Sequence, residues 1–356
     1  MMLNFLNADA CYEALLARDP AYDGVAYVGV KSTGIFCRLV CPARKPKREN
    51  CEFYPTVGEC LAAGFRPCKR CSPMAPAAQS DPVVKRLMDA LDADPARRWR
   101  EEDVAKMDID PSTARRAFKR QFGMTFLALA RLKRIRGGFE TLSDAGKVIA
   151  AQHDAGFASS SGFRSAFAKI LGVSPGTMRH GGEFRADWLE TVLGPMVTVA
   201  DKNRLYLLEF TDRKGLSSEL QRLQVAVKSE IGIGRHPPSE QVQQELERFF
   251  DGENARFETP LAFWGSDFSK SVWSVLREIP AGETRSYGDI AKAVGRPTAA
   301  RAVARANGAN PLAIIVPCHR IIGADGSMTG YGGGLWRKQK LIELERQYVE
   351  GRERRT

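Results

Sequence analysis

The sequence predicts a multidomain α+β protein, and three observations lead to that fold class. The chain of 356 residues is long enough for several domains. Seven of its eight cysteines precede residue 72, and a Pro/Ala/Ser-rich stretch typical of a linker, SPMAPAAQS, follows them. Segments with helical spacing of apolar residues then flank one region of strand-like apolar runs. We expect a cysteine-rich unit over 1–78, an all-α unit over 79–180, an α/β unit over 181–260 and a mostly helical unit over 261–356.

The net charge of the chain is +11 at pH 7, and most of the positive excess lies in the first half. Such a charge favours a polyanionic partner, of which nucleic acid is the usual one. The alternative is that the charge only keeps the protein soluble. We find neither the basic start of a signal peptide nor an apolar run of about 18 residues. We therefore expect no membrane partner and a cytoplasmic location, at the nucleoid in a bacterium.

The first unit contains two short cysteine pairs, Cys37-x3-Cys41 and Cys68-x2-Cys71. Four thiolates at this spacing suit one tetrahedral Zn²⁺, whereas a disulfide framework is not expected without a secretory signal. From spacing alone, a purely structural zinc site is the favoured interpretation. Basic residues crowd these ligands and suit phosphate contacts, Arg44 and Arg66 among them. The remaining cysteines of this unit have no such partner and are expected to be structural thiols: Cys11, Cys51 and Cys60.

The all-α unit contains two segments with the pattern helix, turn, helix. In the first, residues 99–123, Asp110 is placed to cap the second helix and Pro111 to begin it. In the second, residues 148–175, Gly156 stands at the turn and a serine run opens the next helix. A basic helix, TFLALARLKRIRGG, links them. Exposed arginines of the second helices are the candidate DNA contacts: Arg115, Arg116 and Arg164. The alternative is two helical hairpins with solvated charged faces.

One pattern, GF-x2-SS-x-F-x3-F-x4-G-x-SP from Gly156 to Pro175, resembles the second half of an AraC-type DNA-binding domain. FKRQFGMT, which begins at Phe118, is similar to the end of the first half. The resemblance implies two recognition helices in the major groove, at about 112–121 and 159–169. Phe126 departs from the family, which usually has proline there, at the start of the linking helix.

The region 181–256 lacks a sharp motif. TVLGPMVTVA and RLYLLEF read as strands, and residues 217–228 read as an amphipathic helix. HGGEFRADW, residues 180–188, reads as a break between units.

The lone late cysteine lies in IIVPCHRIIG, where short apolar runs flank Cys318 and His319. On a strand, the two side chains would point to opposite faces. The pair therefore needs a turn to cooperate, which Pro317 helps to set. A bare Cys-His pair is more often a buried thiol beside a satisfied histidine, and that alternative stays open on this motif alone.

The sequence around this motif closely resembles the O6-alkylguanine-DNA alkyltransferases. The resemblance runs from IPAGETRSYGDIAKAVGRPTAARAVARANGANP through GSMTGYGGGLWRKQKLIELE. TGIFCR and AAGFRPCKRC are also similar to the zinc-site motifs of the Ada family, and all three parts occur in the same order as in that family. The resemblance implies a ribonuclease-H-like α/β subdomain before a helical catalytic domain. It also implies single-use transfer of methyl groups from DNA, combined with activation of transcription.

The resemblance implies roles for particular residues of the last domain. A relay would pass the proton of the Cys318 thiol through water to His319, which Glu345 orients, and Asn310 would brace the turn. Tyr331 would donate to the base and aid departure of the guanine. A minor-groove helix-turn-helix at 287–306 would flip the base out, with the DNA-binding roles held by two residues: Arg301 and Tyr287. Glycine stands at 332, where many relatives have serine.

The resemblance also assigns chemistry to the zinc cluster. Cys37 would accept a methyl group from a DNA methylphosphotriester, with DNA contacts that include Thr33. Loss of one negative charge there would tighten promoter binding. The expected partners are double-stranded DNA and RNA polymerase, with one Zn²⁺ per chain and a monomeric state. The rival interpretation is a transcription regulator with a structural zinc module and no acceptor activity.

Overall fold

The computed structural model describes residues 7–19, 22–23, 26–55, 59–60, 63–68, 70–71, 73, 81–178 and 180–353. The chain divides into two compact units. The first is Met1–Lys85 with Ile322–Thr329, and the second is Arg86–Ile321 with Gly330–Thr356. Of the predicted linker 72–80, only Pro73 is among the described residues. The boundaries at 78, 180 and 260 stay predictions.

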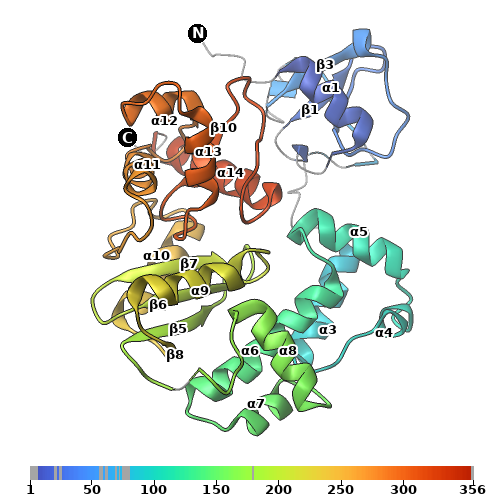
Figure 1. Ribbon diagram of the computed structural model, residues 1–356. Helices are drawn as coiled ribbons and strands as arrows, with labels where there is room; N and C mark the ends of the chain where they lie inside the picture. Colours follow the sequence, from blue (N-terminus) through green and yellow to red (C-terminus); the bar gives the residue numbers. More distant parts are fainter. Residues whose placement is uncertain are drawn as a thin grey trace. The chain divides into compact units, whose positions relative to one another are not determined.

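The first unit contains a four-stranded sheet in the order β3-β1-β2-β4, together with helix α1 (Figure 1). β1 is antiparallel to β2 and β3, whereas β4 is parallel to β2. A side chain at Gly29 would place its Cβ 2.7 Å from the Phe65 ring, so the packing of that ring on β1 requires glycine. The elements are α1 (Ala8–Ala17), β1 (Tyr27–Val30), β2 (Ile35–Arg38), β3 (Cys51–Tyr54) and β4 (Arg66–Pro67).

The predicted helix-turn-helix segments are both present in the second unit. The Asp110 carboxylate accepts the N–H of Thr113 at 2.8 Å, and Pro111 begins the helix, as predicted. Gly156 has φ +62°, and a Cβ there would lie 2.3 Å from the Ala96 carbonyl oxygen. The helices are α3 (Pro82–Ala93), α4 (Glu101–Ala105), α5 (Pro111–Phe122), α6 (Phe126–Ser143), α7 (Val148–Asp154) and α8 (Ser160–Leu171).

Helix α6 joins the two helix-turn-helix segments. Arg134, on this helix, is buried, and its guanidinium donates to the carbonyl oxygens of Ala155 at 2.9 Å and Gly156 at 2.5 Å. Thr125 caps the helix, and Phe126 is its buried first residue. The departure from proline at this position therefore leaves the start of the helix intact.

The α/β part has a sheet in the order β7-β6-β5-β8, with β8 parallel to β5 and the other pairs antiparallel. The interpretation of 180–188 as a break was wrong, because Phe184–Leu189 forms β5 in the middle of the sheet. Asp187 made this strand look polar, but it is buried and accepts a 2.6 Å bond from Arg235. The elements are β5 (Phe184–Leu189), β6 (Met196–Ala200), β7 (Leu205–Phe210), α9 (Leu216–Val227), β8 (Ile231–Ile233) and α10 (Pro237–Phe250).

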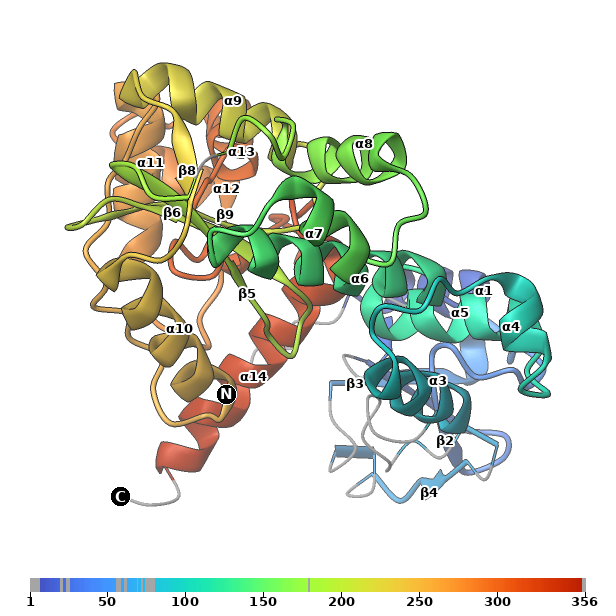
Figure 2. The same ribbon diagram turned by 90° about the horizontal axis from the view of Figure 1, so that it is seen from below.

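The last part is mainly helical and shares one apolar core with β6, β7 and α10. The predicted helix-turn-helix at 287–306 is present as α12 and α13, and Figure 2 shows α14 as one uninterrupted helix. No helix within the described ranges is long and apolar enough to cross a membrane. The elements are α11 (Asp267–Arg277), β9 (Arg285–Ser286), α12 (Tyr287–Ala293), α13 (Ala300–Gly308), the 3-10 turn η3 (Cys318–Arg320), β10 (Ile321–Ile322) and α14 (Leu335–Glu353).

Candidate active site and metal centre

The four predicted zinc ligands meet at one point in the first unit. The Sγ atoms of Cys37, Cys41, Cys68 and Cys71 all lie within 4.8 Å of one another. Around a tetrahedral zinc with Zn–S bonds of 2.3 Å, sulfur atoms stand about 3.8 Å apart. The Cys41 and Cys68 sulfurs are 4.0 Å apart, so the donor set fits a single Zn²⁺.

Strand pairing assembles this cluster. Cys37 lies on β2, and the parallel pairing of β4 with β2 continues into a 3.0 Å bond from the Cys68 N–H to the Phe36 carbonyl. The backbone N–H of Arg38 donates to the Cys71 sulfur at 3.4 Å. Two cysteine pairs that are 26 residues apart in sequence are therefore brought together by the edge of the sheet.

The other three cysteines of this unit are free and buried, which fits their predicted structural role. Cys11 and Cys51 belong to the apolar core around the zinc ligands, whereas Cys60 packs with Tyr27, Phe36 and Phe65. Burial raises the pKa of Cys11 to about 11 and that of Cys60 to about 12. These two thiols stay protonated at neutral pH and are poor nucleophiles.

The predicted DNA contacts of this unit all have exposed side chains. Arg44 follows the ligand Cys41, Arg66 lies on β4, and Thr33 occupies the turn between β1 and β2. The Thr33 hydroxyl donates to the Val30 carbonyl at 3.2 Å. Their exposure suits contact with phosphates, and their role stays a prediction.

In the second unit, Cys318 lies in a tight turn and not on a strand. The N–H of Ile315 donates to the Ala313 carbonyl at 2.9 Å, and the N–H of Cys318 donates to the Val316 carbonyl at 2.7 Å. Each bond closes a three-residue turn. Ile314, at the centre of the first, has φ +71°, which is rare for a β-branched residue. Such strain persists only where the surroundings hold it, and it is common at active sites.

Asn310 holds this turn from within. Its amide nitrogen donates to the Cys318 sulfur at 3.1 Å and to the Val316 carbonyl at 2.9 Å. Its Oδ1 accepts the Leu312 N–H at 3.0 Å. The outer edge of β7 secures the same segment, because Leu208 exchanges backbone bonds with residues 311 and 313. These contacts are the ones that bracing by Asn310 requires, and its role stays a prediction.

His319, Arg320 and Glu345 form a buried polar group beside the thiol. The Nε2 atom of His319 lies 2.8 Å from a Glu345 oxygen, and the Arg320 guanidinium donates to both oxygens of that carboxylate at 2.7–3.1 Å. Burial alone would raise the pKa of Glu345, but His319 and Arg320 outweigh it and lower the pKa to about 2. Glu345 is therefore a carboxylate that fixes the imidazole by accepting its Nε2–H.

The buried polar atoms without a hydrogen-bond partner among the described residues include two that belong to predicted site residues. They are the Nδ1 atom of His319 and the hydroxyl of Tyr331. Buried polar groups are normally paired, so both atoms are available for a hydrogen bond to water or to a bound base. Burial lowers the pKa of His319, which is thus neutral, and raises the pKa of Cys318 to about 11. The thiol needs a base, and the Nδ1 atom of a neutral imidazole can accept a proton.

Two functional groups were missed at the level of sequence. Arg320 is a buried cation paired with Glu345, and Lys338 is a fully buried ammonium that donates to the Ile321 carbonyl. Burial lowers the pKa of Lys338 to about 8, against the attraction of Cys318. A signal was present for Lys338, because it precedes Glu345 by two helical turns and lies on the same face of α14.

The predicted DNA contacts of the second unit are distributed over four helices, α5, α8, α12 and α13. Arg301 is exposed near the start of α13, and half-buried Tyr287 begins α12. The arginines of the helix-turn-helix segments are all exposed, and Arg115 is paired with Glu101. These arginines are Arg115 and Arg116 on α5 and Arg164 on α8.

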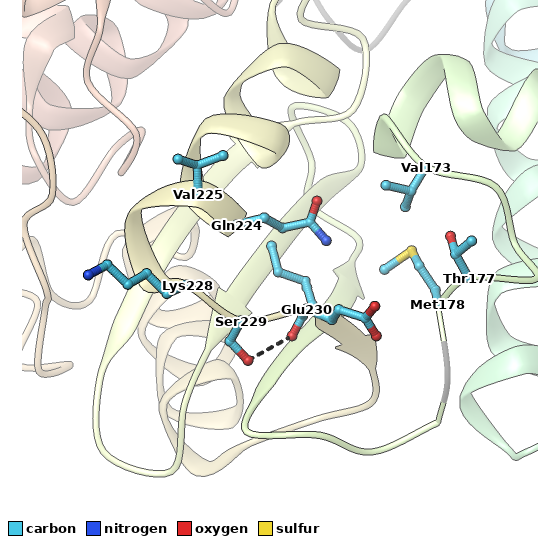
Figure 3. Close-up of a pocket in the computed structure, with 9 residues that line it drawn as sticks. Val173, Thr177, Met178, Gln224, Val225, Lys228, Ser229 and Glu230 are labelled. Atoms are coloured by element: carbon cyan, nitrogen blue, oxygen red, sulfur yellow. Dashed lines mark hydrogen bonds between the residues drawn. The ribbon is translucent and has the colours of Figure 1, made fainter.

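A groove of about 500 Å³ also lies between α9 and the segment that follows α8 (Figure 3). Met178 and Thr177 face Gln224 across it, and Val225 stands at its rim. Neither cysteine nor histidine is among its lining residues, so it is separate from both cysteine centres.

Comparison with known families agrees with this arrangement. The family model described as the metal binding domain of Ada matches residues 10–74, a helix-turn-helix domain matches 104–181, and the DNA binding domain of 6-O-methylguanine DNA methyltransferase matches 267–347. The fold and its two cysteine centres thus define a multidomain DNA-binding protein that joins a metal site to a methyltransferase domain.

Relatives along the whole chain give the family. The bifunctional transcriptional activator/DNA repair enzyme Ada of Escherichia coli is 37% identical over 97% of this chain and 98% of its own length. The regulatory protein ada of Salmonella typhimurium is 33% identical over 96% and 98%. A methylated-DNA–protein-cysteine methyltransferase of Methanosarcina acetivorans is 42% identical over 44% of this chain and 94% of its own. The chain belongs to the Ada family.

Proposed function

We propose that this protein repairs alkylated DNA by irreversible methyl transfer to two of its own cysteines and is thereby switched into a transcriptional activator. Cys318 accepts the methyl group of O6-methylguanine, and of O4-methylthymine, while Cys37 accepts that of a DNA methylphosphotriester. The observation that carries the proposal is the Cys318 site. The amide of Asn310 donates to its thiol at 3.1 Å, and the adjacent His319 is held by the Glu345 carboxylate through Nε2, which leaves its buried Nδ1 available to accept a proton.

The reacting oxygen of O6-methylguanine lies inside the duplex, so the base has to leave the stack. Flipping costs about a few kcal/mol. The helices α12 and α13 supply the groove-binding element. Arg301, exposed near the start of α13, fills the vacated space, and Tyr287 at the start of α12 turns the phosphate.

Within the site, the thiol proton of Cys318 passes through a water to Nδ1 of His319. The sulfur then attacks the methyl carbon, an S–C bond forms, and the C–O6 bond breaks. The electron pair of that bond leaves with the guanine, which the Tyr331 hydroxyl stabilises by donating a hydrogen bond. The proton held by His319 returns to the departing base through water. The thioether has no leaving path, so each Cys318 acts once.

Glu345 keeps this proton path in one direction. Its carboxylate accepts the Nε2–H of His319, which leaves Nδ1 as the acceptor on the side of the thiol. Three hydrogen bonds from Arg320 hold the orientation of this carboxylate. If the His319 imidazole lost this orientation, the buried Cys318 thiol would keep its high pKa and would have no base to accept its proton.

Cys37, Cys41, Cys68 and Cys71 would hold one zinc ion. Zinc bound there keeps the four thiols deprotonated at neutral pH. The Cys37 sulfur attacks the methyl carbon of the phosphotriester, the C–O bond breaks, and the phosphate regains its negative charge. Exposed Thr33, Arg44 and Arg66 contact the neighbouring backbone.

This transfer also changes the charge that faces DNA. Four thiolates around Zn²⁺ carry two net negative charges, and methylation of one sulfur removes one of them. Removing a unit charge at about 5–8 Å from a phosphate changes the binding free energy by a few tenths to a few kcal/mol, depending on the effective dielectric. The methylated protein therefore binds its promoter more tightly, through the arginines of α5 and α8. It acts as a monomer at the nucleoid and engages RNA polymerase there.

The proposal is tested with duplexes that carry a labelled methyl group at either O6 of guanine or a backbone phosphate. We expect one label per chain on Cys318 from the first duplex, one on Cys37 from the second, and no turnover. Peptide mapping assigns the label, and Cys318→Ala and Cys37→Ala are the controls. A protein that binds both duplexes but takes up no label would be a regulator with a structural zinc module, and the proposal would be wrong.

A further inference from the structure

Arg213, in the loop after β7, reaches the segment that carries Asn310. Its Nη2 donates to the Gly308 carbonyl oxygen at 2.8 Å, and its Nη1 lies 3.4 Å from the carbonyl oxygen of Asn310. These carbonyls belong to the end of α13 and to the residue whose side chain holds Cys318. A guanidinium from a part of the sequence 97 residues away therefore fixes the backbone from which the bracing amide projects.

Two buried carboxylates hold this guanidinium. Nη1 of Arg213 is in contact with a Glu209 oxygen and lies 2.5 Å from Oε2 of Glu219. The side chains of Arg213, Glu209 and Glu219 are 11%, 3% and 1% exposed. Burying three charges costs desolvation energy that apolar packing would avoid, so stability alone does not account for such a cluster.

Arg213 also borders the other wall of the site. A Cβ on Gly332 would lie 3.1 Å from Nε and 3.4 Å from Cζ of Arg213. Gly332 follows Tyr331, whose hydroxyl is one of the two unpartnered atoms. The guanidinium thus lies close to both the Asn310 segment and the glycine segment that follows Tyr331. Its positive charge favours the Cys318 thiolate, whereas Glu209 opposes it.

We propose that Arg213, held by Glu209 and Glu219, is a positioning residue for methyl transfer: it fixes the Gly308 and Asn310 carbonyls so that the Asn310 amide stays aimed at the Cys318 sulfur. The inference rests on the proposed function of Cys318 and extends it to a group outside the catalytic relay. Arg213 touches neither the thiol nor, in this arrangement, the reacting atoms. It acts through Asn310.

The test uses the full-length protein with Arg213→Lys, which keeps the charge but loses the fork that spans two carbonyls. Glu219→Gln is the second variant, because burial raises the pKa of Glu219 to about 7 and the neutral side chain is therefore tolerated. Exposed Arg204, at the other end of β7, gives the matched control Arg204→Lys. Thermal unfolding measures the folded fraction of each protein.

Three quantities are measured: the Kd for a duplex with O6-methylguanine, the single-turnover rate of transfer to Cys318, and the pH profile of Cys318 alkylation by iodoacetamide, followed by peptide mapping. For Arg213→Lys we expect an unchanged Kd, a rate at least 10-fold lower and a pH midpoint shifted upward. For Glu219→Gln, we expect a transfer rate and a pH midpoint between those of Arg213→Lys and those of the wild type. Wild-type rates and midpoints in both variants, or losses in proportion to the unfolded fraction, would overturn the proposal. Failure of the wild type to accept methyl would contradict the proposed function instead.

Discussion

The amide nitrogen of Asn310 lies 3.1 Å from the sulfur of Cys318 and donates a hydrogen bond to it. A bond to the charged form of a thiol lowers its pKa, and here it opposes the burial that raises the pKa to about 11. Nucleophile strength at Cys318 therefore depends on a neighbour eight residues earlier in the chain.

Replacing that neighbour should slow the reaction. For Asn310→Ala, we expect the transfer rate to fall by about 10- to 100-fold, since a hydrogen bond to a charged group is worth about 1.5–3 kcal/mol. The pH midpoint of thiol alkylation should rise. Quenched-flow assays with labelled O6-methylguanine DNA measure the transfer rate, and alkylation by iodoacetamide at several pH values measures the midpoint. Unchanged kinetics in a folded variant would show that the bond to sulfur has no role.

Removing the hydroxyl of Tyr331 should lower the rate of methyl transfer without lowering the stability of the protein. It is buried and has no partner within the described chain, so Tyr331→Phe removes an unsatisfied group. We expect an equal or higher unfolding temperature, together with a transfer rate lower by about 10- to 100-fold, as for loss of a hydrogen bond to the developing charge on the guanine. Calorimetry and single-turnover rates on one preparation test this. Tyr348→Phe, on α14 and 17 residues later in the chain, is the control.

Acid should destabilise the second unit through Glu345. Its pKa is depressed from 4.5 to about 2, so its contribution to stability is full above pH 4.5 and is lost as the pH falls toward 2. The contribution amounts to about 3 kcal/mol by linkage. Glu345→Gln should flatten this part of the stability profile. It should also lower stability at pH 7 by about 3–5 kcal/mol, because Arg320 loses its buried partner.

Denaturant titrations between pH 2 and pH 7 provide the measurement for Glu345. The exposed Glu253→Gln serves as the control and should leave the profile unchanged. If Glu345→Gln lost stability with falling pH as steeply as the wild type, that loss would have to come from other carboxylates.

Zinc removal should affect the two units differently. The four sulfurs within 4.8 Å of one another predict one zinc per chain, and a chelator should unfold the first unit while Cys318 still accepts methyl. Metal analysis and methyl transfer on the same samples test this. Cys41→Ser should lose zinc, whereas Cys60→Ser should retain it. Loss of zinc in the Cys60 variant would contradict the assignment of ligands.

Arg301 should contribute to lesion binding more than to the chemistry. Arg301→Ala is expected to weaken binding to lesion duplexes and, if a phosphate contact is lost, to reduce the slope of log K against log salt by about 1. Arg277→Ala, exposed on α11, is the control. Fluorescence anisotropy between low and physiological salt gives both slopes. If Arg301→Ala and Arg277→Ala had equal slopes and equal affinities, Arg301 would not be a DNA contact.

Local signals in the sequence predicted much of this protein correctly. The cap at Asp110, the turn at Gly156 and the paired cysteine spacings each lie within a few residues of the feature they specify. The strand β5 was missed because Asp187 looks exposed in sequence, and only its pairing with Arg235, 48 residues away, makes it a buried residue.

By itself, the sequence determined the kind of chemistry: two thiol pairs that suit zinc, and a Cys-His pair that needs a turn. The family resemblance already placed Glu345 and Asn310 beside that pair, and tertiary structure alone added Arg320 and Arg213. Arg320 meets Glu345 across 25 residues, and Arg213 meets Asn310 across 97. The physical reason is that helix caps and metal spacings arise from neighbouring residues. The protonation of a buried thiol depends instead on charges and hydrogen bonds that packing brings together from distant parts of the chain.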